Sequence, residues 1–206
     1  MTRFRLDSAA VGHGPAAALP PTSVDFGPGE IRVVTALGGQ QPTVLSLVAA
    51  GRMAPTSGRV APENRRLALV DTPSVAEHPA ELGVGSVIRE ELAWLPRRDR
   101  RGGVRKVLAR HDLAGYRKLP FSALSAQTRM ELLVELALAR PDVDGVVVTS
   151  PERHGGATIS WWRTLSDAAA RGAAVLVVTD SATAETLERM PLPAPEATDL
   201  PLFDLS

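Results

Sequence analysis

The sequence predicts an α/β fold in which a mostly parallel sheet is flanked by helices. Four short apolar runs lie at about residues 31–37, 66–70, 144–149 and 173–179, and segments with helical periodicity separate most of them. Apolar runs of this kind are typical of strands that are covered on both faces. The chain has 206 residues, of which 44% are hydrophobic and 22% charged, enough for one compact domain with a sizeable core.

The first third is predicted to begin with strands. Residues 3–11 alternate between polar and apolar side chains, which favours an edge strand. Residues 23–37 indicate a strand, a turn at Gly27-Pro28-Gly29 and a second strand. A helix is expected over 42–51, because Pro42 suits a first helical turn and Gly51 marks the end. Residues 54–60 indicate a turn that leads into a short strand.

Helices dominate the rest of the chain. They are expected at about 83–95, 104–113, 126–140, 158–172 and 181–190. Trp161 and Trp162 are neighbours on one helix, so one is expected in the core and the other is a candidate interface anchor. The basic run at 97–106 is either a solvated loop between two helices or a contact for an acidic segment or a lipid surface.

Composition excludes several classes of function. The formal net charge is zero, which argues against a nucleic-acid partner. The absence of cysteine excludes disulfides, thiolate metal sites and cysteine nucleophiles, and it fits the cytoplasm. The four histidines, at 13, 78, 111 and 154, lack the close spacing of a metal site, so no metal ligand is predicted. No apolar run is long enough to span a membrane.

Three stretches resemble, in order, the nucleotide-binding subunit of ATP-binding cassette (ABC) transporters. FGPGEIRVVTALGGQQPTVLSLVAAGRMAPTSGRV is similar to the family's first strand, phosphate loop, helix and following turn. LSAQTRMELLVELALARPDVDGVVVTSP is similar to the signature motif, its helix and the second Walker strand. RGAAVLVVTDSATAETLERM is similar to the switch-histidine strand and the next helix. The resemblance implies a P-loop NTPase-like fold, with one domain over 1–190, a helical subdomain at about 73–122 and a Pro-rich tail at 191–206.

The segment that matches the phosphate loop lacks most of its chemistry. The family pattern is G-x-x-x-x-G-K-[ST], in which backbone N–H groups and the lysine bind phosphate and the hydroxyl binds magnesium. Here Ala36 and Gln41 stand at the glycines, Pro42 stands at the lysine, and only Thr43 matches. The resemblance therefore predicts a degenerate nucleotide-binding segment made of Gly38, Gly39, Gln40, Gln41, Pro42, Thr43 and Val44. The alternative is a strand-to-helix turn that binds no ligand.

The signature motif is also altered. Its positions fall on residues 124–128, where Ser125, Ala126 and Gln127 form a signature-like segment without the paired glycines. In the family this segment caps a nucleotide held by the opposite subunit. The alternative role for Ser125 is a helix N-cap.

The charged catalytic positions of the family are replaced as well. Thr149 and Ser150 stand where an aspartate and a glutamate are expected, and Asp180 stands at the switch histidine. Asp71 falls near the glutamine that precedes the helical subdomain, and Glu152 is a candidate substitute base or a solvated loop acid. No residue is therefore assigned a catalytic role, and the chain's own loop is expected not to support hydrolysis.

The resemblance leads to a first interpretation and two alternatives. The first is a catalytically impaired ABC-type ATP-binding subunit that acts as a partner or regulatory subunit of a transporter, with ATP and Mg²⁺ bound weakly at best. Its partners would be a membrane permease or an intact ABC ATPase subunit, in a homo- or heterodimer, in the cytoplasm or on the inner face of the membrane. The second is half of an asymmetric ATPase heterodimer that lends its signature segment. The third is a soluble interaction module without a nucleotide function.

Overall fold

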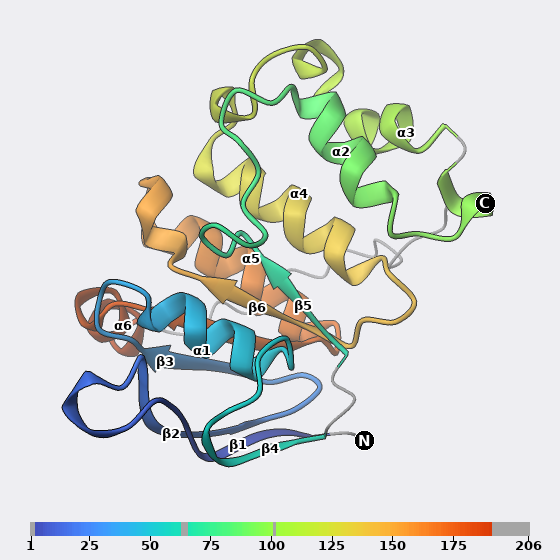
Figure 1. The fold of residues 1–206 in the computed structure, drawn as a ribbon. Helices are drawn as coiled ribbons and strands as arrows, with labels where there is room; N and C mark the ends of the chain where they lie inside the picture. The colour runs from blue at the N-terminus through green and yellow to red at the C-terminus, as the bar shows by residue number, and fades with distance from the viewer. Residues whose placement is uncertain (1–2, 63–65, 101, 191–206) are drawn as a thin grey trace.

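Two sheets and a layer of helices make up the fold. The computed structural model describes residues 3–62, 66–100 and 102–190 (Figure 1). An antiparallel sheet of order β2-β1-β4 contains β1 (Phe4–Val11), β2 (Leu19–Phe26) and β4 (Ser57–Ala61). A parallel sheet of order β3-β7-β6-β5 contains β3 (Ile31–Thr35), β5 (Leu67–Val70), β6 (Gly145–Thr149) and β7 (Ala174–Thr179).

The parallel sheet confirms the central expectation from the sequence. The four apolar runs form one sheet, and α1 (Gln41–Ala49) begins six residues after β3 ends. The expectation that residues 3–11 form an edge strand is wrong, because β1 lies between β2 and β4. The run at 31–37 is shorter than expected and only partly buried, since β3 is at the edge of its sheet.

The strands of the parallel sheet are covered on both faces. Val147, Leu176 and Val178 face a core shared with α1 and the antiparallel sheet, so α1 is packed between the two sheets. Their neighbours Val146 and Val177 face the opposite core, which α4 (Ala126–Leu138) and α5 (Thr158–Ala170) cover. This two-sided burial explains why the strands are apolar throughout.

The remaining helices complete the outer layer. α2 (Val84–Leu92) and α3 (Gly103–Arg110) pack on each other beyond α4 (Figure 1). Short 3₁₀ turns connect and follow them, at Arg97–Arg100, Ala114–Tyr116 and Phe121–Ala123. α6 (Ser181–Glu188) follows β7 and packs near β3. The Pro-rich stretch at 191–206 lies outside the described residues.

The two tryptophans of α5 are both in the core. Trp161 is 2% exposed and Trp162 is 4% exposed, and their rings meet edge to face with centroids 6.3 Å apart. The prediction of one exposed interface anchor is therefore wrong. Because α5 packs against the sheet on one side and against α4 on another, two adjacent positions are buried at once.

Candidate functional site

The loop between β3 and α1 closes on itself. Leu37 N–H donates to Oε1 of Gln41 at 2.6 Å, so a side chain from the first helical turn takes a loop amide. Pro42 has no N–H to offer at the second position of α1. The Leu37 side chain is 78% exposed, and Gly39 has a φ of +74°, which the loop needs to turn into the helix. Two backbone donors are therefore not available to a phosphate: the Leu37 N–H is bonded to Gln41, and Pro42 has no N–H.

The structure places the other residues of the predicted segment in or beside the loop. Gly38, Gly39 and Gln40 are exposed, and Gln40 is the N-cap of α1 but makes no side-chain capping bond. Thr43 and Val44 belong to the first turns of α1, and Val44 packs in the core between the two sheets.

Thr149, which the sequence resemblance places at the magnesium aspartate, lies in a group of three buried hydroxyls. Oγ1 of Thr149 lies 2.7 Å from Oγ of Ser46 and 2.9 Å from Oγ1 of Thr72. All three side chains are fully buried and come from β6, α1 and the end of β5. Thr149 bonds to both of the other hydroxyls, so the three form a neutral chain of hydrogen bonds.

Asp180 has a local structural role. Its carboxylate accepts from Thr183 N–H at 2.6 Å and caps the N-terminus of α6. Glu152 accepts from Oγ1 of Thr179 at 2.7 Å, at the end of the neighbouring strand β7. Both acids are therefore engaged by neighbouring groups of the chain.

The signature-like segment begins α4. Oγ of Ser125 accepts from Thr128 N–H at 3.1 Å, which confirms the N-cap expected from the sequence. Ser125 and Gln127 are exposed, and Gln127 donates to Glu131 at 2.8 Å. Ala126 lies against the loop after β6, because a Cβ added to Gly156 would be 3.3 Å from its methyl group.

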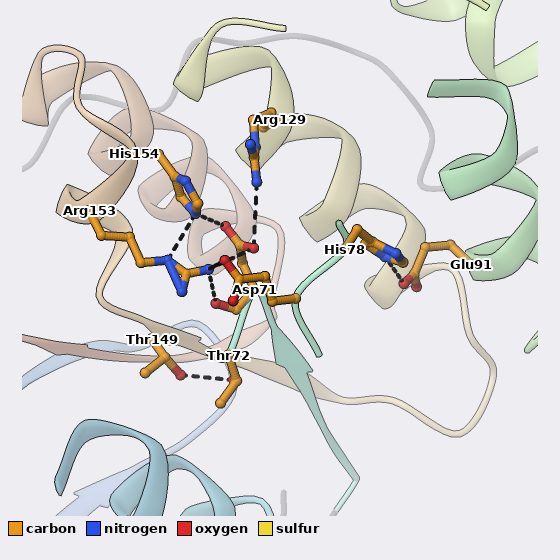
Figure 2. Close-up of polar contacts among 9 residues, drawn as sticks. Asp71, Thr72, His78, Glu91, Arg129, Thr149, Arg153 and His154 are labelled. Carbon is orange, nitrogen blue, oxygen red and sulfur yellow. Dashed lines mark hydrogen bonds and ion pairs between the residues drawn. The ribbon is translucent and has the colours of Figure 1, made fainter. Parts of the chain in front are cut away.

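Another polar cluster lies around Asp71, outside the loop between β3 and α1. Asp71 follows β5, is 3% exposed and has a φ of +54°. Nε2 of His154 lies 2.5 Å from Oδ2, and a terminal nitrogen of Arg153 lies 2.9 Å from Oδ1 and donates to the Asp71 carbonyl at 2.6 Å (Figure 2). Nε of Arg153 also lies 3.0 Å from Nε2 of His154. Since Nε2 cannot donate and accept at once, the shorter contact to the carboxylate takes the proton.

Charge sets the protonation of this cluster. Burial by itself raises the pKa of Asp71, but the hydrogen bond and charge of His154, followed by Arg153 and Arg129, bring that pKa below its usual value. Asp71 is therefore ionised at neutral pH. For His78, burial lowers the pKa, whereas the hydrogen bond and charge of Glu91 and the charges of Glu90 and Asp71 raise it, with a net increase.

A cleft opens beside the Asp71 cluster. Its volume is about 360 Å³, and it is lined by Glu77, His78, Pro79, Ala80, Arg129 and His154. These residues come from the segment after β5, from α4 and from the turn after β6. The sequence alone assigned no function to His154 beyond excluding a metal site, and it did not point to Arg129. The available signal was that Asp71 and His154 each follow a buried strand, which places them at the same sheet edge if the strands are neighbours.

Comparisons with known proteins agree with this architecture. No protein-family model matches the chain, and no curated protein sequence does. An ATP-binding subunit of an ABC transporter is similar in structure, with a TM-score of 0.61 and 17% identity over 90% of this chain and 82% of that one. A dimeric bacterial ABC transporter cassette is similar with a TM-score of 0.64 and 15% identity, over 88% of this chain and 90% of that one. A post-hydrolysis structure of that cassette bound to ADP and Pi gives the same values. The chain therefore has a P-loop NTPase-like fold. Within that class it has the fold of an ABC transporter ATP-binding cassette.

The residues at the loop do not fit a magnesium nucleotide. The Gln41 side chain takes one loop amide, and Pro42 supplies neither a charge nor a donor. Thr149 offers a neutral hydroxyl that is already bonded to Ser46 and Thr72. Hard divalent cations prefer carboxylate ligands, and none is present in this hydroxyl network. No step of phosphate chemistry can be derived from this arrangement.

Proposed function

We propose that this chain is a catalytically impaired cassette-type subunit that acts as a partner or regulatory subunit of a transporter. The observation that carries the proposal is the loop between β3 and α1, where the Gln41 side chain holds the Leu37 amide at 2.6 Å. A phosphate would have to displace that bond and would then find Pro42 in place of a lysine. The cassette fold without its phosphate chemistry favours a role in assembly over turnover.

The direct test is phosphate release by the purified chain at saturating ATP and Mg²⁺. We expect no release above the level of the heat-inactivated protein. Thr43→Ala is the matched variant, because only Thr43 matches the resemblance's loop pattern and because its side chain is half-buried, whereas that of Val44 is buried. Steady turnover that Thr43→Ala removes would contradict the proposal.

The variant Pro42→Lys separates binding from catalysis. It returns a positive charge and a backbone donor, which are worth about 1–3 kcal/mol in nucleotide affinity if both reach phosphate. We expect a modest gain in ATP binding by calorimetry and no turnover, because Thr149 still provides no carboxylate. Turnover by this single variant would show that another residue, such as Glu152, already acts as a base.

The exposed Ser125 and Gln127 support a second candidate, in which the chain lends this segment to an intact cassette subunit. Ser125 uses its hydroxyl as a cap but remains accessible at the start of α4. Mixing the chain with an intact cassette and measuring the ATPase rate of the mixture distinguishes the two. A stimulation that Ser125→Ala abolishes favours the lending of the segment, and a change of rate that Ser125→Ala leaves intact favours a regulatory partner.

A further inference from the structure

A buried arginine, whose side chain makes no hydrogen bond to the described residues, lines the cleft beside Asp71. Arg129 is 8% exposed, and its guanidinium carbon lies 4.6 Å above the centre of the Phe121 ring. The nearest acceptor is Oδ1 of Asp71, at 3.8 Å from a terminal nitrogen. Within the described residues no side-chain nitrogen of Arg129 makes a hydrogen bond, and its Nε is buried without a partner. A guanidinium has five N–H donors, and a buried charged donor left unmet is strongly destabilising.

Asp71 does not satisfy Arg129, because its Oδ1, which makes no hydrogen bond within the described residues, lies 3.8 Å from the nearest guanidinium nitrogen. His154 takes Oδ2 at 2.5 Å, and Arg153 lies 2.9 Å from Oδ1. Arg129 approaches the same Oδ1 from a longer distance, as Figure 2 shows. The charge of one carboxylate is thus shared among three basic side chains, and the guanidinium of Arg129 keeps its donors for another acceptor.

The rest of the wall defines what that acceptor can be. Both ring nitrogens of His78 are engaged, by Glu91 at 2.8 Å and Glu90 at 3.4 Å, so His78 shapes the wall and donates nothing further. Glu77 is half-exposed on the rim and lies 3.4 Å from Arg153. The rim carboxylate disfavours ligands with three or more negative charges, such as nucleoside triphosphates. A volume of about 360 Å³ suits a small molecule.

We propose that this cleft binds a small free oxyanion, a monocarboxylate or a single phosphate group, through the guanidinium of Arg129. The planar fork of arginine matches the two oxygens of such a group and forms charge-assisted hydrogen bonds with them. The site lies between the segment after β5, α4 and the turn after β6, apart from the loop at residues 36–43. It does not depend on whether the chain acts as a transporter subunit.

The test is calorimetric titration of the full chain with acetate and, separately, with inorganic phosphate at constant ionic strength. We expect saturable binding at one site for at least one of the two anions. Arg129→Gln removes the charge and most donors and should weaken binding about tenfold or more, which corresponds to about 1.4 kcal/mol. Arg129→Lys keeps the charge without the fork, so it should bind with intermediate affinity and serves as the test if Arg129→Gln does not fold.

Arg140→Gln is the matched control. Arg140 follows the same helix, has a side chain 12% exposed, and lies over the Trp94 ring at 5.0 Å with a buried Nε that also lacks a partner. It does not line the cleft, so its replacement should leave the affinity unchanged within about twofold. Saturable binding that only the Arg129 variants weaken supports the site. Absence of saturable binding, or equal loss in Arg140→Gln, overturns it and leaves water as the partner of Arg129.

Discussion

Removing the charge of Asp71 should expose how much the cluster contributes to stability. Asp71→Asn keeps the shape of the side chain but leaves Arg153 and His154 facing a neutral amide in a site that is 3% exposed. Breaking a buried ion pair by removing one partner costs about 3–5 kcal/mol. We expect a loss of about 3 kcal/mol, the lower end of this range. In the variant, Arg153 keeps its hydrogen bond to the carbonyl oxygen of residue 71 and its 3.4 Å contact with Glu77. For a domain of this size that loss lowers Tm by about 6–12 °C.

The measurement is urea unfolding at several pH values, with Asp142→Asn as the control. Asp142 forms a long, 3.8 Å contact with Arg140 and has a side chain 71% exposed, so its variant should stay within about 0.5 kcal/mol of the parent. The pKa of Asp71 is lowered on folding. Its contribution is therefore fully present above its unfolded pKa of about 3.9 and is lost as pH falls through the lower folded value. The free energies of unfolding of the parent and Asp71→Asn should begin to approach each other below about pH 4 and should converge only below the folded pKa of Asp71. A loss under about 1 kcal/mol at neutral pH, or no convergence in acid, would refute the reasoning.

Three further changes test individual contacts by urea unfolding. Thr149→Asp should lower the free energy of unfolding by about 2 kcal/mol or more, because the new carboxylate is buried among hydroxyls and not beside a cation; an unchanged or higher stability contradicts this. Gly58→Ala should cost at least about 2 kcal/mol, since its φ is +79° and the added Cβ would lie 2.2 Å from the Ser8 carbonyl oxygen; near-neutral behaviour would mean that β1 moves aside. Ser125→Ala should cost about 1 kcal/mol through the lost cap on Thr128 N–H, whereas Ser125→Asp should retain most of that energy.

Local patterns in the sequence were sufficient for most elements of the fold. The period of apolar residues located α4 and α5, and continuous apolar runs located β6 and β7. The helix N-cap at Ser125 could also be predicted from the sequence, because its acceptor and donor are only three residues apart. The alternation in residues 3–11 indicated a strand but not its place in the sheet, because a strand with one covered face alternates at an edge or in the centre.

The candidate cleft could not be predicted in the same way. Asp71 and Arg153 are 82 residues apart, and they meet only because β5 and β6 are neighbours in the sheet. The order of strands follows from tertiary packing and is not encoded in any local period. No pattern in the sequence singled out Arg129, because its burial results from the packing of its side chain over Phe121. The double burial of Trp161 and Trp162 has the same origin, because α5 has two packing partners.

The residues that the sequence resemblance places at altered positions of the cassette pattern have structural roles of their own, so we expect no ATPase activity from single changes at these positions. Gln41 closes the loop through the Leu37 amide, Thr149 bonds two buried hydroxyls, and Asp180 caps α6. Returning any of these to the family's residue therefore removes a contact that stabilises the fold before it adds a ligand for phosphate or magnesium. Asp180→His shows the conflict most simply. The imidazole replaces the carboxylate that caps α6, so the variant should lose about 1 kcal/mol in the free energy of unfolding, measured with urea. We expect no gain in ATP affinity by calorimetry, because the loop still lacks a charge at Pro42. A gain in affinity from Asp180→His alone would mean that the loop binds phosphate despite the bond between Leu37 and Gln41.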